Sequence, residues 1–546
     1  MTSKTCNLNR RNFLKTGTAG LTLLMSGAAG SRLAAQDASG QVVIGFSQEP
    51  TVLHPHMPHI EVDEGVHFNL FDPLFTVNSD GDFVPALATE VPTVENGGVS
   101  EDGLKWRVKL REGVTWHDGE PFTAEDVKFT IELQQDPNFS AMRRTGHELV
   151  RNIEVVNDHE ITWEMESPFA PYVSILSWTF IVPAHILADA EDPNQTDFRN
   201  SPVGTGAFSF GERVAGNYIQ LNANPDWWGD GPYLETVIFR YIPDMTVLYT
   251  QFRTGDIDVI GLQGIQFDRF EQAKQLDDRE VVITQASTVE SISFNLGKPQ
   301  FQDPAVREAL YYALDKTTII DAIYYGIPEP TESFLPKGSS YFHEGLPKSE
   351  YNLEKAKQIL DEAGWVPGDD GVRVKDGVRL AFKNSTTAGN SVREQTQQFI
   401  QQDFAEIGVE MEISNLPPAV MWGEYWQMSE FDTAMVGIVY TTGPDPDVSN
   451  YFHSTAISAQ GGAGQNTWQY QNEAVDELLE EGASLFVQEE RKTIYNKLQE
   501  VVREDLPFLP IFQYANLRGH KAGLEGFDPN VNVRIETWNV GEWRWV

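Results

Sequence analysis

Three histidines, His54, His56 and His59, lie within six residues in the segment LHPHMPH. Neutral imidazole is the commonest metal ligand in proteins, so this spacing could bind zinc, copper or nickel. Pro55 and Pro58 favour extended conformations for the residues before them, and the three rings then need not converge on one point. From these residues alone, a metal site and a loop without metal both stay open.

Other candidates for catalysis have stronger structural explanations. His117 beside Asp118 could form a general-base pair, but Asp118-Gly119 is better explained as a turn. Gly204 and Gly206 in PVGTGAFSFGE lack the third glycine and the lysine of a phosphate loop, which favours a tight turn entering a hairpin. The chain has no G-x-S-x-G, P-loop or H-E-x-x-H motif.

The segment YTTGPDPDVSNYFHS is the most promising candidate for a binding site. Asp445 and Asp447 flank a proline, and Tyr440 lies close in sequence. A solvated proline turn is one explanation, and an aromatic-walled pocket for a cationic or hydroxylated ligand is the other. Trp422 in MWGEYW could add a stacking surface, although aromatics at this spacing are more often part of a core.

The elements that must position these residues alternate between strands and helices. Alternating apolar residues predict strands in QVVIGFSQ, LKWRVKL, IEVVNDHEITWEM and ETVIFRYIP. Thr123 and Asp126 predict a capped helix, and Asp303-Pro304 predicts the start of a single helix that Gly326 can close. A further helix is expected in NLEKAKQILDEAG, ending at Gly364. Two segments are expected to form a helix followed by a strand: SVREQTQQFIQQDFAEIG with VEMEISNL, and EERKTIYNKLQEVVREDLPFLPIFQYANL. This alternation indicates an α/β fold.

Composition excludes several classes of function. The 546 residues carry 80 acidic and 40 basic side chains, a formal net charge of −40. Nucleic acid is excluded as a partner because its phosphates require a basic face. Apolar residues make up 40% of the chain, which is ample for a core and excludes an acidic disordered chain. This length exceeds what one core usually holds, so two or more lobes are expected.

The N-terminal segment NRRNFLKTGTAGLTLLMSGAAGSRLAA resembles a twin-arginine export signal, with Arg10 and Arg11 ahead of a weakly apolar stretch. Its apolar part is too short for a membrane span. Cys6, the only cysteine, precedes the twin arginines, so the mature chain would have no lipid anchor and no disulfide. We expect residues 1–35 to be a signal peptide and the mature protein to be soluble in the periplasm.

Four blocks resemble the family 5 extracellular solute-binding proteins, the dipeptide, oligopeptide and nickel receptors of ABC importers. They are LKWRVKLREGVTWHDGEPFTAEDVKFTIE, NPDWWGDGPYLETVIFRYIPDMTVLYTQFRTGDIDV, ISFNLGKPQFQDPAVREALYYALD and NLEKAKQILDEAGW. The resemblance implies an α/β, two-lobed periplasmic binding protein of the large, cluster C type, with an extra subdomain in the first lobe. Its hinge strands would fall near ESISFNL and PIFQYANL. The first lobe would comprise residues 36–290 and 514–546, with the subdomain at about 79–199, and the second lobe residues 291–513.

The same resemblance implies ligand contacts. Relatives hold a peptide's α-amino group with an aspartate in the loop matching YTTGPDPD, where Thr442 stands nearer that place and Asp445 follows three residues later. An arginine near the start of the helix matching SVREQTQQF holds the ligand carboxylate in relatives, and Arg393 is close to that position. His54 occupies a loop position that is commonly filled without metal. The expected ligand contacts are Asp445, Arg393, Thr442, Tyr440, Trp422, His54 and Asn295.

The function expected from this resemblance is capture of a peptide by a monomeric receptor that delivers it to an inner-membrane ABC permease, without catalysis, metal or cofactor. Tryptophans that could stack on sugars keep an oligosaccharide receptor open, and nickel relatives keep a metal-chelate receptor open. From another class, the alternative is a secreted hydrolase, for which no catalytic set was found.

The export signal generates a first prediction. Replacing Arg10 and Arg11 with lysine should leave the precursor in the cytoplasm, because the twin-arginine pair is the recognised part of the signal. The measurement is the periplasmic yield of wild type and variant, and an unchanged yield would refute the assignment.

Overall fold

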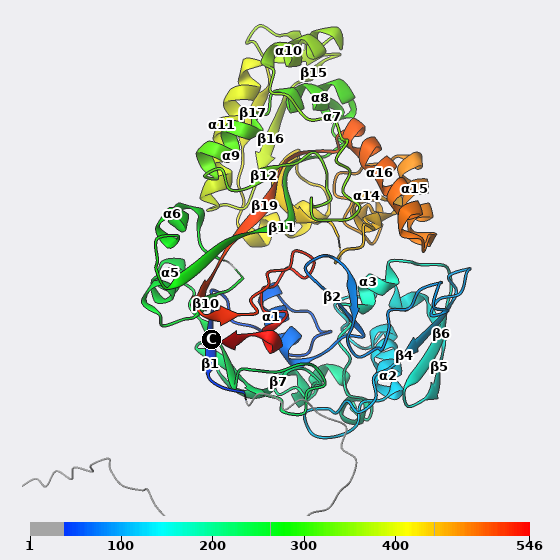
Figure 1. The fold of residues 1–546 in the computed structure, drawn as a ribbon. Coiled ribbons are helices and arrows are strands. Elements are labelled where there is room, and N and C mark those ends of the chain that lie inside the picture. The colour runs from blue at the N-terminus through cyan, green and yellow to red at the C-terminus, as the bar shows by residue number, and fades with distance from the viewer. Residues whose placement is uncertain (1–37, 263, 442) are drawn as a thin grey trace, which may run out of the picture. The chain divides into compact units, whose positions relative to one another are not determined.

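The computed structural model describes residues 38–262, 264–441 and 443–546, so the expected export signal and Cys6 lie outside the described residues. Its principal feature is one mixed sheet (Figure 1). The spatial order is β17 (Glu410–Ile413), β16 (Ala381–Ser385), β18 (Thr433–Val439), β11 (Arg279–Phe294), β19 (Phe508–Lys521), β10 (Val259–Ile260), β1 (Gln41–Phe46), β9 (Thr236–Tyr241), β8 (Tyr218–Ala223) and β7 (Phe208–Val214), with β12 (Glu329–Pro330) also paired to β19.

Two long antiparallel strands, β11 and β19, join the two halves of this sheet. Their ladder pairs Arg279–Gln285 with Ala515–Lys521, shifts register, and resumes at Val289 opposite Gln513. Strand β18 pairs only with the later part of β11, from Thr288 onward, whereas β10 pairs with β19 only at Gly519 and His520. The register break therefore falls where the chain passes from one half of the sheet to the other.

The helices vary widely in length, from single turns to α16. They are α1 (Glu61–Leu70), α2 (Ala124–Gln135), α3 (Tyr172–Leu176), α4 (Ala184–Leu187), α5 (Met245–Thr254), α6 (Phe270–Ala273), α7 (Pro299–Gln302), α8 (Pro304–Tyr312), α9 (Lys316–Ile323), α10 (Leu353–Glu362), α11 (Ser391–Glu406), α12 (Pro418–Met421), α13 (Glu424–Gln427), α14 (Ser449–Phe452), α15 (Glu473–Ser484) and α16 (Gln488–Asp505). Among the described residues, none of them is both long and apolar enough to span a bilayer.

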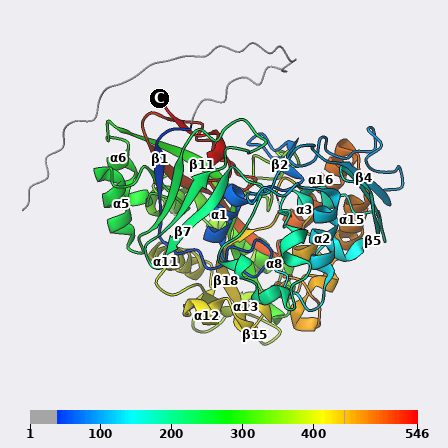
Figure 2. The ribbon, with the colours of Figure 1, turned by 90° about the horizontal axis from the view of Figure 1, so that it is seen from below.

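Small sheets complete the structure. They are β4 (Lys105–Lys109) with β6 (Glu160–Met165) and β5 (Val150–Asn157), β2 (Phe75–Val77) with β3 (Phe83–Pro85), β13 (Val366–Pro367) with β14 (Arg373–Lys375) and β15 (Val378–Arg379), and β20 (Leu524–Glu525) with β21 (Arg544–Trp545). Figure 2 shows β4, β5 and α2 at the side of the molecule, apart from β1 and β7.

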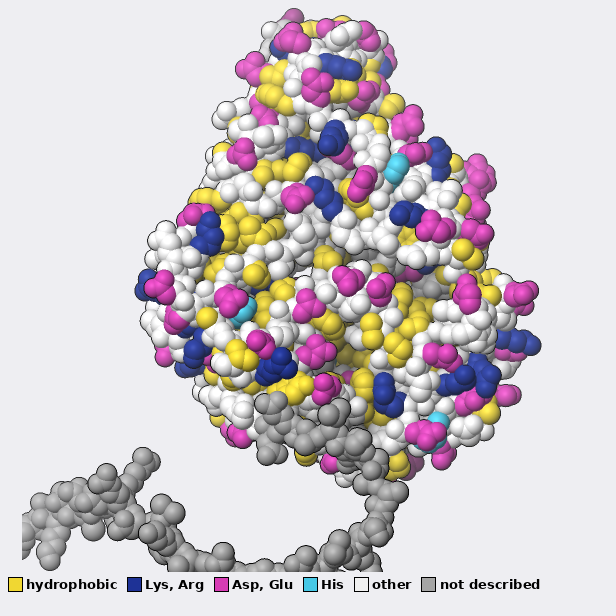
Figure 3. All heavy atoms as spheres, viewed as in Figure 1, with side chains coloured by type: hydrophobic (Ala, Val, Ile, Leu, Met, Phe, Trp, Pro, Cys, Tyr) yellow, Lys and Arg dark blue, Asp and Glu magenta, His cyan; other side chains and the backbone are white. Residues whose placement is uncertain are grey.

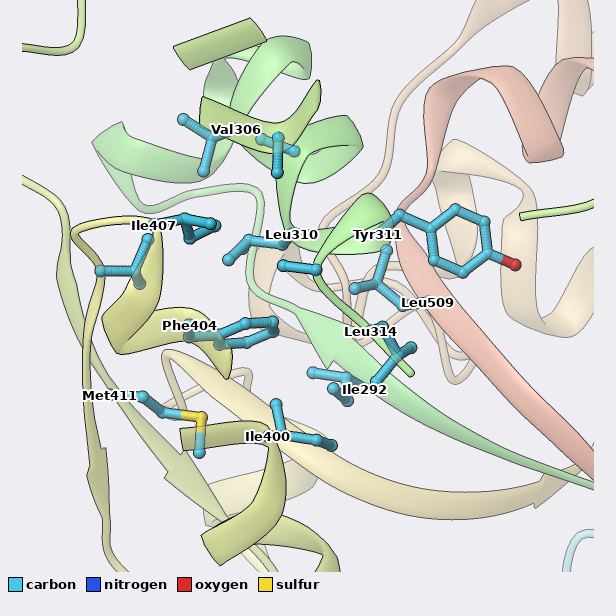
Figure 4. Close-up of a cluster of buried hydrophobic side chains, with 14 of the residues drawn as sticks. Ile292, Val306, Leu310, Tyr311, Leu314, Ile400, Phe404, Ile407, Met411 and Leu509 are labelled. Carbon is cyan, nitrogen blue, oxygen red and sulfur yellow. The ribbon is translucent and has the colours of Figure 1, made fainter. Parts of the chain in front are cut away.

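Separate hydrophobic cores form around these elements. One packs α8, α9 and α11 against the later part of β11, and Figure 4 shows Ile292, Leu310, Phe404 and Leu509 among its side chains. Another contains the buried Trp106, which stacks on Trp163 with ring centroids 5.9 Å apart. The members of that second core run from Leu74 to Ile181. Independent cores are what separate lobes and an inserted subdomain require, while the exact boundaries stay a prediction.

Most local expectations are confirmed. QVVIGFSQ forms β1, LKWRVKL forms β4, IEVVNDHEITWEM forms the β5–β6 hairpin and ETVIFRYIP forms β9. Thr123 precedes α2, and its backbone N–H donates to the Asp126 carboxylate at 2.9 Å. Both expected helix–strand pairs are present, as α11 with β17 and α16 with β19.

The prediction of a single helix after Asp303 is wrong. It is broken into α8 and α9 because the Asp315 side chain accepts the Thr318 N–H at 3.0 Å and caps a new helix. A side chain that satisfies a free backbone donor in this way offers the chain an alternative to continuing the first helix.

The two glycines of PVGTGAFSFGE lie against the end of α1. A Cβ on Gly204 would be 1.8 Å from the Leu70 carbonyl oxygen, and the Gly206 N–H donates to that same oxygen at 3.0 Å. Because glycine has no side chain, these two positions allow the backbone before the β7–β8 hairpin to lie close to the backbone at the end of α1.

We therefore expect Gly204→Ala to lower the free energy of unfolding by about 1–3 kcal/mol or more, because the added methyl group meets backbone atoms that cannot move aside. Denaturant unfolding measures the change. Gly338→Ala is the matched control, since a Cβ there has only one ordinary contact, 3.6 Å from Val531. Equal stabilities for the two variants would contradict this role.

Candidate functional site

The strongest candidate for a binding site is a cavity of about 520 Å³, within the usual range of small-molecule pockets. Its walls come from segments that precede β11 and segments that follow it, together with one residue after β19. The lining includes Pro55, His56, His59, Glu64, Met142–Thr145, Ser174, Trp178–Phe180, Val439–Thr441, Asp445, Asp447, Tyr451, Gln465 and Arg534.

The histidine-rich loop forms part of this wall, but its rings do not converge. His56 Nε2 donates to the Phe180 carbonyl at 2.6 Å, and His59 Nδ1 donates to the Met57 carbonyl at 2.8 Å. His54 is fully buried and packs against Phe139 and Phe198, with ring centroids 5.3 and 5.2 Å away. Burial lowers the pKa of His56 to about 4, which keeps that ring neutral.

Within the described ranges, no group of three or more His, Cys, Asp or Glu side chains is arranged to hold a metal ion. His54 does not line the cavity, whereas His56 and His59 do. The absence of metal binding stays a prediction.

An acidic side chain from α1 faces the cavity next to these rings. Glu64 lies 3.6 Å from His59 Nε2 and 4.0 Å from an Arg143 nitrogen. Burial alone would raise the pKa of Glu64, but the contact with His59 and the charges of Arg534 and Arg143 outweigh burial and lower it. Glu64 is therefore ionised at neutral pH.

Two arginines flank a tryptophan in the same wall. The Arg143 guanidinium carbon lies 5.8 Å from the Trp178 ring centroid, and that of Arg534 lies 5.3 Å from it. Desolvation within the cavity and the neighbouring charge of Arg534 lower the pKa of Arg143. The two like charges repel each other, as the effect of Arg534 on the pKa of Arg143 shows, so an anion in contact with both would be stabilised by both.

Asp445 lines the cavity but is already bound within the protein. Arg491 of α16 donates to its two oxygens at 2.7 and 3.0 Å, and the Asp447 N–H donates at 2.9 Å. The side chains of Asp445 and Arg491 are each only 7% exposed, so this is a desolvated, two-pronged ion pair. Thr442 lies outside the described residues.

Arg393 belongs to a second buried ion pair and does not line the cavity. It donates to both oxygens of Glu290 on β11, at 2.7 and 2.8 Å. The Tyr514 hydroxyl of β19 also donates to Glu290, at 2.7 Å. The pair ties the start of α11 to the two long strands beside their register break.

The remaining expected contacts divide between wall and scaffold. Tyr440 lines the cavity and stacks on Phe452, with ring centroids 5.8 Å apart. Trp422 is 40% exposed, donates to the Thr387 hydroxyl and does not line the cavity. Asn295 is buried and donates to two backbone carbonyls, those of Ser429 and Phe431. Ligand contacts for all these residues stay predictions.

Sequence reasoning missed the charged groups that face the cavity, apart from Asp445 and the neighbouring Asp447. The pair Arg143-Arg144 was a usable signal, since adjacent arginines are unusual in so acidic a chain. Glu64 and Arg534 gave no comparable signal, because the positions that join them to the cavity are set by contacts remote in sequence.

Comparison with known proteins identifies the family. Residues 82–460 match the model of the bacterial extracellular solute-binding proteins, family 5 Middle. The chain belongs to this family. The oligopeptide-binding protein AppA of Bacillus subtilis is 28% identical, over 96% of this chain and 96% of AppA.

Two solved structures of binding proteins share the fold. The structure of Bacillus subtilis AppA in complex with a nonapeptide matches with a TM-score of 0.76 and 27% identity, covering 93% of this chain and 99% of AppA. Campylobacter jejuni NikZ in complex with Ni(L-His) matches with a TM-score of 0.78 and 25% identity, covering 92% of this chain and 99% of NikZ. The expected α/β, two-lobed binding-protein fold is confirmed.

The two roles considered for Arg393 make different predictions. In Arg393→Met the buried Glu290 loses its cationic partner, which should lower the free energy of unfolding by about 3–5 kcal/mol. The double variant Arg393→Met with Glu290→Gln should recover part of that loss. Denaturant unfolding of the three proteins decides, and a stable Arg393→Met variant that has lost only ligand binding would contradict the structural role.

Proposed function

We propose that this protein is a periplasmic substrate-binding protein of an ABC importer, which captures a peptide or peptide-like solute between two lobes and delivers it to an inner-membrane permease. The observation that carries the proposal is the cavity of about 520 Å³ whose walls come from both sides of the β11–β19 connection. Its lining combines aromatic rings with charges of both signs, as a ligand with polar ends and an apolar body requires.

Membership of the family and the likeness to a peptide-bound oligopeptide receptor support a peptide as the ligand. The Ni(L-His) complex of NikZ keeps a metal chelate as the second candidate. No metal or cofactor of the protein's own takes part in this proposal. The protein acts as a monomer that binds without turnover, and export by the twin-arginine route through residues 1–35 precedes its function.

The register break is the proposed hinge. Ala286, Ser287 and Thr288 of β11 and Tyr514 of β19 line a second cavity, of about 400 Å³, beside the break. Open space next to two strands with an interrupted ladder allows them to bend at low cost. The lobes are residues 36–290 with 514–546 and residues 291–513, and the inserted subdomain spans about 79–199.

Ligand bound between two lobes contributes free energy only to the closed state, so binding should compact the molecule. We expect small-angle scattering to show a smaller radius of gyration when a pool of random tripeptides to pentapeptides is added. The peptides should be recovered intact by mass spectrometry. Cleaved peptides would indicate the hydrolase alternative, and binding without compaction would contradict the hinge.

A further inference from the structure

The cavity is basic although the protein is acidic. The chain carries a formal charge of −40, and Figure 3 shows acidic side chains spread over the face in view. The cavity wall holds three arginines, Arg143, Arg144 and Arg534, against three carboxylates. One of these carboxylates, Asp445, is neutralised by Arg491, which leaves the arginines in excess.

The aspartate expected to hold a ligand's amino group is poorly placed to do so. Both Asp445 oxygens are bound by the Arg491 guanidinium, and one of them also accepts the Asp447 N–H. An ammonium group at Asp445 would have to displace a buried ion pair or share its acceptor beside a positive charge. In either arrangement the desolvated Arg491 guanidinium would lose part of its interaction with Asp445, which is unfavourable.

The other carboxylates are also partly occupied. One oxygen of Asp447 accepts the Ser449 N–H and hydroxyl, at 3.2 and 2.5 Å. Burial and the neighbouring Asp445 raise the pKa of Asp447, which weakens it as a partner for a cation. Glu64 Oε1 lies 3.6 Å from His59 and 4.0 Å from Arg143, whereas its Oε2 has no hydrogen-bond partner among the described residues. Asp447 and Glu64 are therefore the remaining carboxylates that a test must include.

The arginines differ in how far their donors are already bound. Arg144 donates to the backbone carbonyls of Gln134, Asp136 and Phe139. Among the described residues, Glu64 is the one carboxylate that forms an ion pair with Arg143, at 4.0 Å. Arg534 forms no ion pair with a carboxylate of the described residues, although Glu61 and Glu64 lie near enough to feel its charge.

The backbone supports a functional role for Arg534. Its φ is +62°, a left-handed conformation that costs a residue with a side chain free energy. That conformation accompanies a guanidinium over the Trp178 ring, at the junction of the 520 Å³ and 400 Å³ cavities. Strain of this kind persists where the surrounding structure holds a side chain in a required place.

We propose that the protein recognises a carboxylate of its ligand between Arg143 and Arg534 against Trp178, and does not recognise a free amino group. The substrate class is then anionic peptide-like solutes, among them peptides whose N-terminus is blocked. This inference rests on the proposed capture of peptides in the same cavity and specifies which end of the ligand is bound.

The experiment compares three pools of random tripeptides to pentapeptides made without Asp and Glu, so that the C-terminal carboxylate is their only anionic group. One pool has free termini, one is N-acetylated and one is C-amidated. Retention by the protein is measured by ultrafiltration and mass spectrometry, and the most enriched sequence is titrated calorimetrically in all three forms. Acetylation should change the dissociation constant less than threefold, whereas amidation should weaken binding about tenfold to a hundredfold.

Variants test the named residues. Arg534→Asn removes the guanidinium while keeping a residue that tolerates the left-handed backbone, and it should weaken binding of the free peptide about tenfold or more. Arg143→Gln should do the same, and Asp447→Asn and Glu64→Gln should each weaken binding less than threefold. Arg544→Gln is the matched control, since Arg544 lies over Tyr233, 5.7 Å from the ring centroid, and does not line the 520 Å³ cavity. Melting temperatures confirm that each variant folds.

The outcomes separate this inference from the proposed function. Tenfold weaker binding on acetylation, in Asp447→Asn or in Glu64→Gln, or unchanged binding on amidation or in Arg534→Asn, overturns the inference while peptide capture stands. If no pool is retained, peptide capture is wrong, and titration with citrate, a tricarboxylate without an amino group, decides the anion site. Citrate binding that is lost in Arg534→Asn supports the site, and absence of citrate binding by the wild type overturns it.

Discussion

The buried contact of Arg393 with Glu290 and Tyr514 is the interaction on which the arrangement of the two long strands depends. Glu290 and Tyr514 belong to β11 and β19 and lie beside the register break, and Arg393 comes from the start of α11. Glu290 is fully buried, and a carboxylate taken out of water is costly unless it is both paired and hydrogen-bonded. The Arg393 guanidinium and the Tyr514 hydroxyl together supply Glu290 with three hydrogen bonds and one opposite charge.

A second buried ion pair, Asp445 with Arg491, has a parallel role beside the cavity. It fixes the loop after β18 to α16, and one oxygen of Asp445 also binds the Asp447 N–H. The same aspartate lines both the 520 Å³ cavity and a smaller one of about 250 Å³. A charge that would otherwise attract cationic ligands is thereby made part of the wall. The chemistry of the site then depends on the groups left without such partners.

Local structure could be predicted from the sequence because its causes are local. Alternating apolar residues define β1 and β9, and the Thr123–Asp126 spacing defines the start of α2. The break between α8 and α9 was missed, although Asp315 is a typical N-cap, because the apolar periodicity continues across it. Here a capping side chain outweighed the pattern that suggested one helix.

The site could be predicted only in part, because its contacts join residues far apart in the chain. Asp445 and Arg491 are 46 residues apart, and Arg393 and Glu290 are 103 apart. A charged residue in a loop or at a helix start can contact a ligand, or it can equally well contact a buried ion-pair partner. Family resemblance places such a residue approximately, whereas only the fold shows that its charge is already neutralised. Arg534 was missed for the same reason, whereas Arg143 was missed although the adjacent arginines were a usable signal.

The excess of acidic residues sets a limit on how such a site can work. A chain with a formal charge of −40 repels an anion at long range, so attraction must come from groups close to the ligand. At physiological ionic strength the Debye length is about 8 Å, and exposed carboxylates farther than this from the cavity are largely screened. Arg143 and Arg534 lie with Trp178 inside the cavity wall, where the surroundings screen less than water does. A few enclosed guanidinium groups can therefore outweigh a much larger number of acidic side chains on the surface.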